Sequence, residues 1–146
     1  MPKNKKQGKE VNLSFEARLK LNTLMFEAVR KNNLKALKAA LSAGAEVNWP
    51  TGHYRESALL RAVYLGNFEM VKYLVENGAD VNAIDRCTSG TPLMCAADKG
   101  HFKIIKYLVE HGARVGMLDD HGSNALYYAK TDEIRKYLES ALKKKK

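Results

Sequence analysis

The sequence of 146 residues lacks several features that mark other protein classes. Its two cysteines, Cys87 and Cys95, are too few for a disulfide scaffold and indicate a reducing compartment, so we expect a cytoplasmic location, with a nuclear one as the alternative. No run approaches the roughly 18 uncharged apolar residues that a membrane helix needs. No apolar stretch follows the basic first residues, so we expect no secretory signal. Apolar residues make up 45% and charged residues 28%, which indicates one soluble globular domain and excludes a disordered chain.

Positive charge is concentrated at the two ends of the chain. There are 25 Lys and Arg against 16 Asp and Glu, a formal net charge of +9. Four of the lysines fall in residues 1–9 and four in residues 143–146, which leaves 17 basic and 16 acidic residues between them. We therefore expect a nearly neutral folded body with two basic tails, at 1–12 and 143–146. Weak, salt-sensitive binding of nucleic acid or an anionic membrane by these tails is one functional hypothesis.

Three segments of similar sequence align without gaps at intervals of 34 residues. The segments are residues 43–48, 77–82 and 111–116. A matching apolar stretch precedes each of them, at residues 37–41, 71–75 and 105–109. Three matching registers at one period predict a repeat protein, in which each unit has apolar faces that only stacking on its neighbours can bury.

Each repeat has the signals of two helices joined by a turn and followed by an extended segment. Ser57, Thr91 and Asn124 are N-cap residue types that directly precede helix-compatible stretches. Gly66 and Gly100 fall where the first helix ends, and glycine accepts the left-handed backbone of that position. We call the extended segments that follow the second helices fingers; the first lies at 43–57, the second at 77–91 and the third at 111–124.

These motifs resemble the ankyrin repeats. Residues 90–101 read Gly-Thr-Pro-Leu-Met-Cys-Ala-Ala-Asp-Lys-Gly-His, close to the family's Thr-Pro-Leu-His-x-Ala-Ala-x-x-Gly-His, and residues 77–83 match its Gly-Ala-Asp-Val-Asn-Ala ending. The resemblance implies an all-α solenoid with β-hairpin-like fingers over residues 13–142. The repeats are expected at about 21–54, 55–88, 89–121 and 122–142, after a capping helix at 14–21.

The chain departs from the family pattern at the histidine of the Thr-Pro-Leu-His motif. In the family this histidine makes hydrogen bonds between repeats, whereas Phe26, Leu60, Met94 and Tyr127 hold its positions here. We expect apolar packing to replace that polar network. At the N-terminal end, Phe15 and other apolar residues such as Leu19 are expected to cover the first repeat.

No residue pattern indicates catalysis or metal binding. The four histidines fall at repeat turns or in fingers, and the cysteines are eight residues apart with no second pair, which disfavours a zinc site. No glycine-rich phosphate loop is present. We therefore expect a monomeric, non-enzymatic protein with no cofactor, metal or small-molecule substrate.

The remaining prediction is a protein-binding surface on the concave side, which the resemblance assigns to first helices and finger tips. An adaptor, scaffold or regulatory binder would recognise its protein partner there, and Trp, Tyr and Arg are enriched in binding hot spots. The candidate partner-binding residues are Trp49, Tyr54, Arg55, Arg61, Tyr64, Leu65, Arg86, Asp98, Lys99 and Tyr128. The favoured patch is Trp49, Tyr54, Arg61, Tyr64 and Leu65. The alternative is that Trp49 only rigidifies the first finger.

Overall fold

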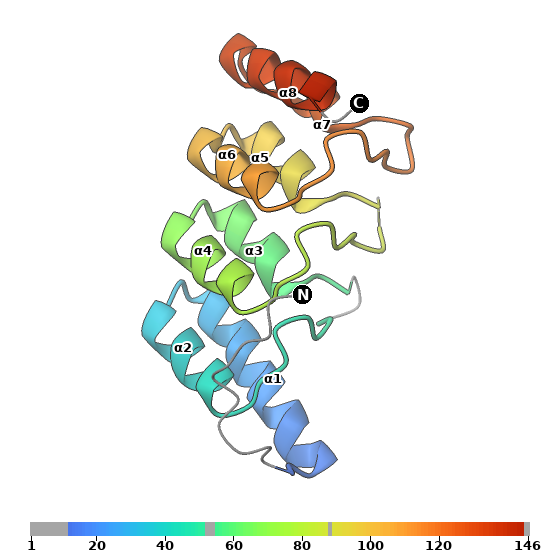
Figure 1. The fold of residues 1–146 in the computed structure, drawn as a ribbon. Helices are drawn as coiled ribbons and strands as arrows, with labels where there is room; N and C mark the ends of the chain where they lie inside the picture. Colours follow the sequence, from blue (N-terminus) through green and yellow to red (C-terminus); the bar gives the residue numbers. More distant parts are fainter. Residues whose placement is uncertain (1–11, 52–54, 88, 145–146) are drawn as a thin grey trace.

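The computed structural model describes residues 12–51, 55–87 and 89–144, and over these residues the chain forms eight helices in four antiparallel pairs (Figure 1). The pairs stack in one row, and the fingers project from one side. The helices are α1 (Phe15–Arg30), α2 (Leu34–Ser42), α3 (Ala58–Leu65), α4 (Phe68–Glu76), α5 (Pro92–Lys99), α6 (Phe102–Glu110), α7 (Ala125–Tyr128) and α8 (Asp132–Lys144). The predicted all-α solenoid is confirmed; the described residues contain one isolated antiparallel bridge, between Thr51 and Glu56 in the first finger.

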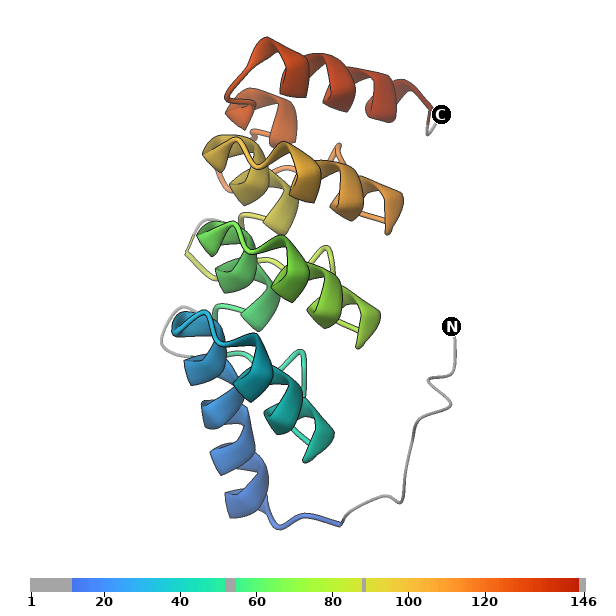
Figure 2. The same cartoon turned by 90° about the vertical axis from the view of Figure 1, so that its left-hand side faces the viewer.

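The helices form two rows. The inner row next to the fingers comprises α1, α3, α5 and α7, each of which contacts the next. The outer row comprises α2, α4, α6 and α8, and Figure 2 shows it from the side opposite the fingers. Ala62 and Ala96 in the inner row are completely buried, because a small side chain lets neighbouring helices approach closely. Leu74 and Leu108 in the outer row are also completely buried.

The predicted helix caps are confirmed. The side chains of Ser57, Thr91 and Asn124 accept hydrogen bonds from backbone N–H groups in the first turns of α3, α5 and α7. Gly66 ends α3 with a φ of +73°, in the left-handed region. A Cβ atom at that position would lie 2.7 Å from Cε1 of His101, so both the backbone and the neighbouring turn require glycine.

Two asparagines join successive repeats at the base of the fingers. The Asn48 amide donates to the Gly78 carbonyl at 3.0 Å and accepts from the Asp80 N–H at 2.8 Å. One repeat later, the Asn82 amide donates to Gly112 at 3.1 Å and accepts from the Arg114 N–H at 2.9 Å. Each side chain thus satisfies a backbone donor and a backbone acceptor of the following repeat, which fixes the spacing between repeats.

The N-terminal end differs from the expected cap. One continuous helix, α1, runs through the expected capping segment and the first helix of the first repeat. Phe15 and Leu19 are 64% and 44% exposed, so the expectation that they cover the first repeat is wrong. The reason is that the helix continues in one direction and carries both side chains past the unit they were expected to cover.

The C-terminal end is a full helix that reaches further than expected. Lys143 and Lys144, which we expected in the tail, form the last turn of α8, where cations interact favourably with the helix dipole. The remaining tail lysines, at residues 1–11 and 145–146, lie outside the described residues. Apolar packing at the histidine positions is confirmed for Met94, which is 4% exposed, but wrong for Tyr127, which is 72% exposed. Among the described residues, no further helix pair stacks on α7 and α8 to cover the Tyr127 ring.

Candidate partner-binding groove

A hollow of about 380 Å³ lies between three inner helices and the fingers, on the side from which the fingers project. We call it the α3–α5–α7 hollow. Helices α3, α5 and α7 supply residues to it, and so do all three fingers. The lining residues are Glu56, Leu60, Tyr64, Asp85, Gly90, Thr91, Met94, Cys95, Asp98, Asp119, His121 and Tyr128. The hollow therefore depends on at least three stacked repeats, and no single repeat could form it.

The apolar part of the lining comes from the inner helices. Leu60 of α3 is half-buried, and Met94 of α5 is 4% exposed. The rings of Tyr64 and Tyr128 lie further along the lining, on α3 and α7. Such a surface can bury an apolar chain while the finger residues around it supply polar contacts.

The polar part of the lining is acidic. Glu56, Asp85, Asp98 and Asp119 are four carboxylates, and no Lys or Arg lines the hollow among the residues that the structure describes. In a partly enclosed surface, charges of one sign favour ligands of the opposite sign.

Asp119 holds the third finger against α7. Its carboxylate accepts hydrogen bonds from the N–H groups of His121 at 2.9 Å and Ser123 at 3.0 Å, and also from the Tyr128 hydroxyl. The Tyr128 hydrogen bond is the main reason that the pKa of Asp119 lies below its usual value. The same bond, followed by burial, raises the pKa of Tyr128 to about 12. This network positions the Tyr128 ring on the lining.

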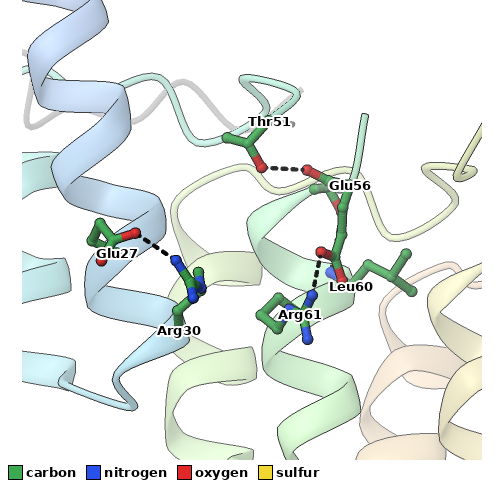
Figure 3. A network of polar contacts seen from close by, with 7 residues as sticks. Glu27, Arg30, Thr51, Glu56, Leu60 and Arg61 are labelled. Carbon is green, nitrogen blue, oxygen red and sulfur yellow. Dashed lines mark hydrogen bonds and ion pairs between the residues drawn. The ribbon is translucent and has the colours of Figure 1, made fainter. Parts of the chain in front are cut away.

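Arg61 and Glu56 brace the first finger against α3 (Figure 3). The Arg61 guanidinium donates to Glu56 Oε2 at 2.8 Å, and the Thr51 hydroxyl donates to the Glu56 carbonyl at 3.0 Å. Thr51 and Glu56 also exchange two backbone hydrogen bonds of 3.1 Å. Arg61 is thus part of the structure that supports the finger.

Tyr64 lies at the edge of the hollow and is 48% exposed. Two cations face its ring: Lys99 Nζ lies 4.5 Å from the ring centroid, and Arg61 Cζ lies 5.4 Å from it. Both distances fall within the range of cation–π contacts. The ring therefore already binds positive charge from this chain and has further exposed surface.

The family model of ankyrin repeats, described as occurring in many copies, matches residues 25–74, 59–109 and 93–129. The matches cover most of the chain and follow the stacked helix pairs. The chain belongs to the ankyrin repeat family. Ankyrin repeats are generally modules for protein–protein interaction, and ankyrin repeat domains are typically non-enzymatic. No curated protein matches the chain.

Three of the predicted partner-binding residues of this ankyrin repeat protein line the α3–α5–α7 hollow. These are Tyr64, Asp98 and Tyr128. Lys99 lies beside the hollow through its contact with the Tyr64 ring. Of the four residues of the favoured patch that the structure describes, only Tyr64 lines the hollow, which lies further toward the C-terminus than those residues.

The other predicted residues lie elsewhere on the repeats. Trp49 is half-buried and packs against the core, which agrees with the alternative of a structural role for this ring. Leu65 is 41% exposed, and Arg55 and Arg86 are exposed finger residues. Tyr54 lies outside the described residues.

The apolar residues that the site prediction missed are Leu60 and Met94. Both hold the position of the family's motif histidine, so a signal for them was present in the sequence. From the sequence, this departure predicts only a change in packing between repeats. In the structure the same substitutions also make part of the lining of the hollow apolar.

Cys95 of α5 lies in the lining of the hollow. Burial is the main cause that raises the pKa of the Cys95 thiol to about 11, so the thiol is neutral at physiological pH and a poor nucleophile. Within residues 12–51, 55–87 and 89–144, no group of three or more His, Cys, Asp or Glu residues could hold a metal ion. No helix in these same ranges has the length and apolar character to span a membrane.

Proposed function

We propose that this ankyrin repeat protein is a regulatory or adaptor module that binds a segment of a partner protein in the α3–α5–α7 hollow. The observation that carries the proposal is the hollow itself. It spans three repeats, has apolar and acidic parts, and lies on the side of the inner helices and fingers. The partner segment would lie across α3, α5 and α7 and contact the fingers.

The size of the hollow supports a segment as the ligand. Its volume of about 380 Å³ lies at the lower end of the range for ligand pockets, about 300–1,000 Å³. A volume of this size accommodates a few side chains of an extended segment. Neighbouring helices and finger tips would add the rest of a standard interface of about 800 Å² per partner.

The test uses the full chain and peptides selected for binding to it from a random-sequence library. Binding of the selected peptides is measured by fluorescence anisotropy to wild type and to Tyr64→Ala. We expect Tyr64→Ala to weaken binding at least about tenfold, the usual effect of removing an aromatic hot spot. A photo-crosslinking side chain at position 64 should form a covalent bond with the peptide.

The matched control is Tyr73→Ala on α4 in the outer row. Tyr73 is also a tyrosine beneath a lysine, with Lys38 Nζ 5.2 Å from its ring centroid. We expect Tyr73→Ala to leave peptide binding unchanged and a crosslinker at position 73 to give no product. Peptides that bind equally well to Tyr64→Ala and crosslink only from position 73 would place the binding surface on the outer row and refute the proposal.

A further inference from the structure

We propose that the α3–α5–α7 hollow selects a Lys or Arg side chain of the partner segment, with Asp98 as the carboxylate that binds its charge. The proposal rests on the proposed function and specifies the chemistry of the ligand. The geometry assigns three parts to the site: a carboxylate on α5, an apolar surface for the aliphatic stem, and aromatic rings beside it.

Charge complementarity identifies the ligand. Even with Asp85 left aside, the lining holds the three carboxylates of Glu56, Asp98 and Asp119, and two cations, Arg61 and Lys99, lie at the Tyr64 ring on its edge. Arg61 is paired with Glu56 at 2.8 Å, and Lys99 lies over the Tyr64 ring. The local charge therefore remains negative, so an acidic segment would be repelled and a basic one attracted.

Among the carboxylates, Asp98 is the one that can accept a new partner. The oxygens of Asp119 already accept three hydrogen bonds from its own finger and α7. Glu56 is held by Arg61, and Asp85 accepts a hydrogen bond from the Cys87 N–H at 2.8 Å. Asp98 is exposed, and its carboxylate has no hydrogen bond or ion pair with any other residue that the structure describes. It can therefore bind an ammonium or guanidinium without breaking a contact of the folded chain.

The surface around Asp98 suits the rest of a basic side chain. Long basic side chains bury their methylene stems on apolar surface and keep the charge at a polar edge. The half-buried Leu60 provides such a surface, with the buried Met94 beneath it, and the Tyr64 ring at its edge already contacts two cations of this chain. An apolar ligand of similar size would use the stem surface but leave Asp98 without a partner.

The experiment tests whether the Lys or Arg side chain of one selected peptide interacts with Asp98, by changing each of them alone and both together. In the peptide, the Lys or Arg is replaced by Met, which keeps the stem length and removes the charge. In the protein, Asp98→Asn keeps the shape and removes the charge. Each change alone should weaken binding about tenfold, as expected for one charge-assisted hydrogen bond. Both together should weaken binding little more than either alone, because they remove the same interaction.

The control is Glu110→Gln, which removes an exposed carboxylate at the end of α6 in the outer row. It should leave the affinity of the Lys peptide unchanged. Equal losses in Glu110→Gln and Asp98→Asn would mean that only the net charge of the protein matters, and they would refute the proposal.

Two further outcomes separate this inference from the proposed function. If the selected peptides lose binding in Tyr64→Ala but have no basic residue and bind Asp98→Asn normally, the groove is correct and the basic anchor is wrong. If the peptides ignore Tyr64→Ala, the proposed function itself fails. Wild-type protein is also examined by sedimentation; a dimer that Asp98→Asn abolishes would make a second copy the occupant and overturn the assignment to a partner segment.

Discussion

The outer and inner rows use similar side chains in different ways. In the outer row, aromatic rings meet between repeats: Phe68 and Tyr107 have centroids 5.5 Å apart, and Phe102 and Tyr137 have centroids 5.6 Å apart, both edge to face. Lys103 Nζ lies 4.1 Å from the Phe68 centroid. The aromatic and basic residues of this face are thus used to join one repeat to the next.

In the inner row, polar contacts mostly hold a finger against the helix that follows it in the chain. Arg61 binds Glu56 at the base of the first finger, and Tyr128 binds Asp119 of the third. Tyr64 remains 48% exposed. The outer row therefore stabilises the stack, whereas the inner row supports the fingers and leaves the Tyr64 ring partly exposed. Substitutions in the outer row should therefore lower stability and leave binding intact. Substitutions of exposed residues in the inner row should lower binding and leave stability nearly unchanged.

The largest effect on stability is expected for Phe102→Ala in the outer row. The change removes a half-buried ring that contacts Tyr137 of the last repeat and lies under Lys106, whose Nζ is 4.3 Å from its centroid. A fully buried Phe→Ala change costs about 3–5 kcal/mol, so we expect about 2 kcal/mol here. Urea denaturation followed by circular dichroism measures it. An unchanged free energy of unfolding would show that the outer aromatic contacts do not hold the repeats together.

A smaller loss is expected for Asn82→Ala, at the base of the second finger. Its side chain makes two exposed hydrogen bonds with the next repeat, each contributing at the lower end of the usual range of about 0.5–1.5 kcal/mol, so the free energy of unfolding should fall by about 1 kcal/mol. Asn48→Ala removes the equivalent pair one repeat earlier and should have a similar cost. If one of the two variants were unaffected, the asparagines would not act as equivalent joints. Urea denaturation of both variants makes the comparison.

The repeated part of this structure could be predicted from the sequence because its causes recur every 34 residues. The N-caps at Ser57 and Thr91 and the glycine turn at Gly66 depend on local backbone chemistry, which a short segment already determines. The roles of Asn48 and Asn82 were not predicted, although both recur with the period. Their partners lie in the next repeat, and the sequence pattern does not show which atoms meet there.

The hollow was harder to predict than the helices because its lining comes from residues that do not repeat. Asp119 and Glu56 come from fingers that differ in sequence and in contacts. The prediction favoured the first finger because it contains Trp49, but exposure depends on how a ring packs, and Trp49 packs on the core. Tyr64, Asp98 and Tyr128 are candidates that do line the hollow, because they lie on inner helices, whose exposed faces follow from the repeat itself.

The pair of Tyr128 and Asp119 should stabilise the inner row only within a range of pH. The lowered pKa of Asp119 stabilises the folded state above its ordinary value of 3.8, and this contribution is lost as pH falls through the folded pKa. The raised pKa of Tyr128 stabilises the folded state below its ordinary value of 10.0, and this contribution is lost as pH rises toward about 12.

Tyr128→Phe removes the hydroxyl of this pair and keeps the ring. Wild type should therefore be more stable than Tyr128→Phe between about pH 5 and pH 9, and the difference should shrink on both sides of that range. Thermal midpoints of the two proteins from pH 3 to pH 11 measure it. The control is Tyr127→Phe, because Tyr127 is 72% exposed and no hydrogen bond of its hydroxyl is found among the described residues. A constant difference across this range would mean that the hydrogen bond does not couple to ionisation.

The smallest effect on stability is expected for Tyr64→Ala, and it gives the sharpest contrast with Phe102→Ala. Because the Tyr64 ring is about half exposed and its cation contacts are at the surface, the free energy of unfolding should change by no more than about 0.5 kcal/mol. Arg61→Ala is a less suitable probe, since it also removes the ion pair that braces the first finger.

Urea denaturation and peptide binding are measured on the same preparations of Tyr64→Ala and Phe102→Ala. Tyr64→Ala should lose binding and keep stability, whereas Phe102→Ala should lose stability and keep binding below its unfolding transition. If each variant lost both stability and binding, the outer row would not be specialised for stability or the inner row for peptide binding.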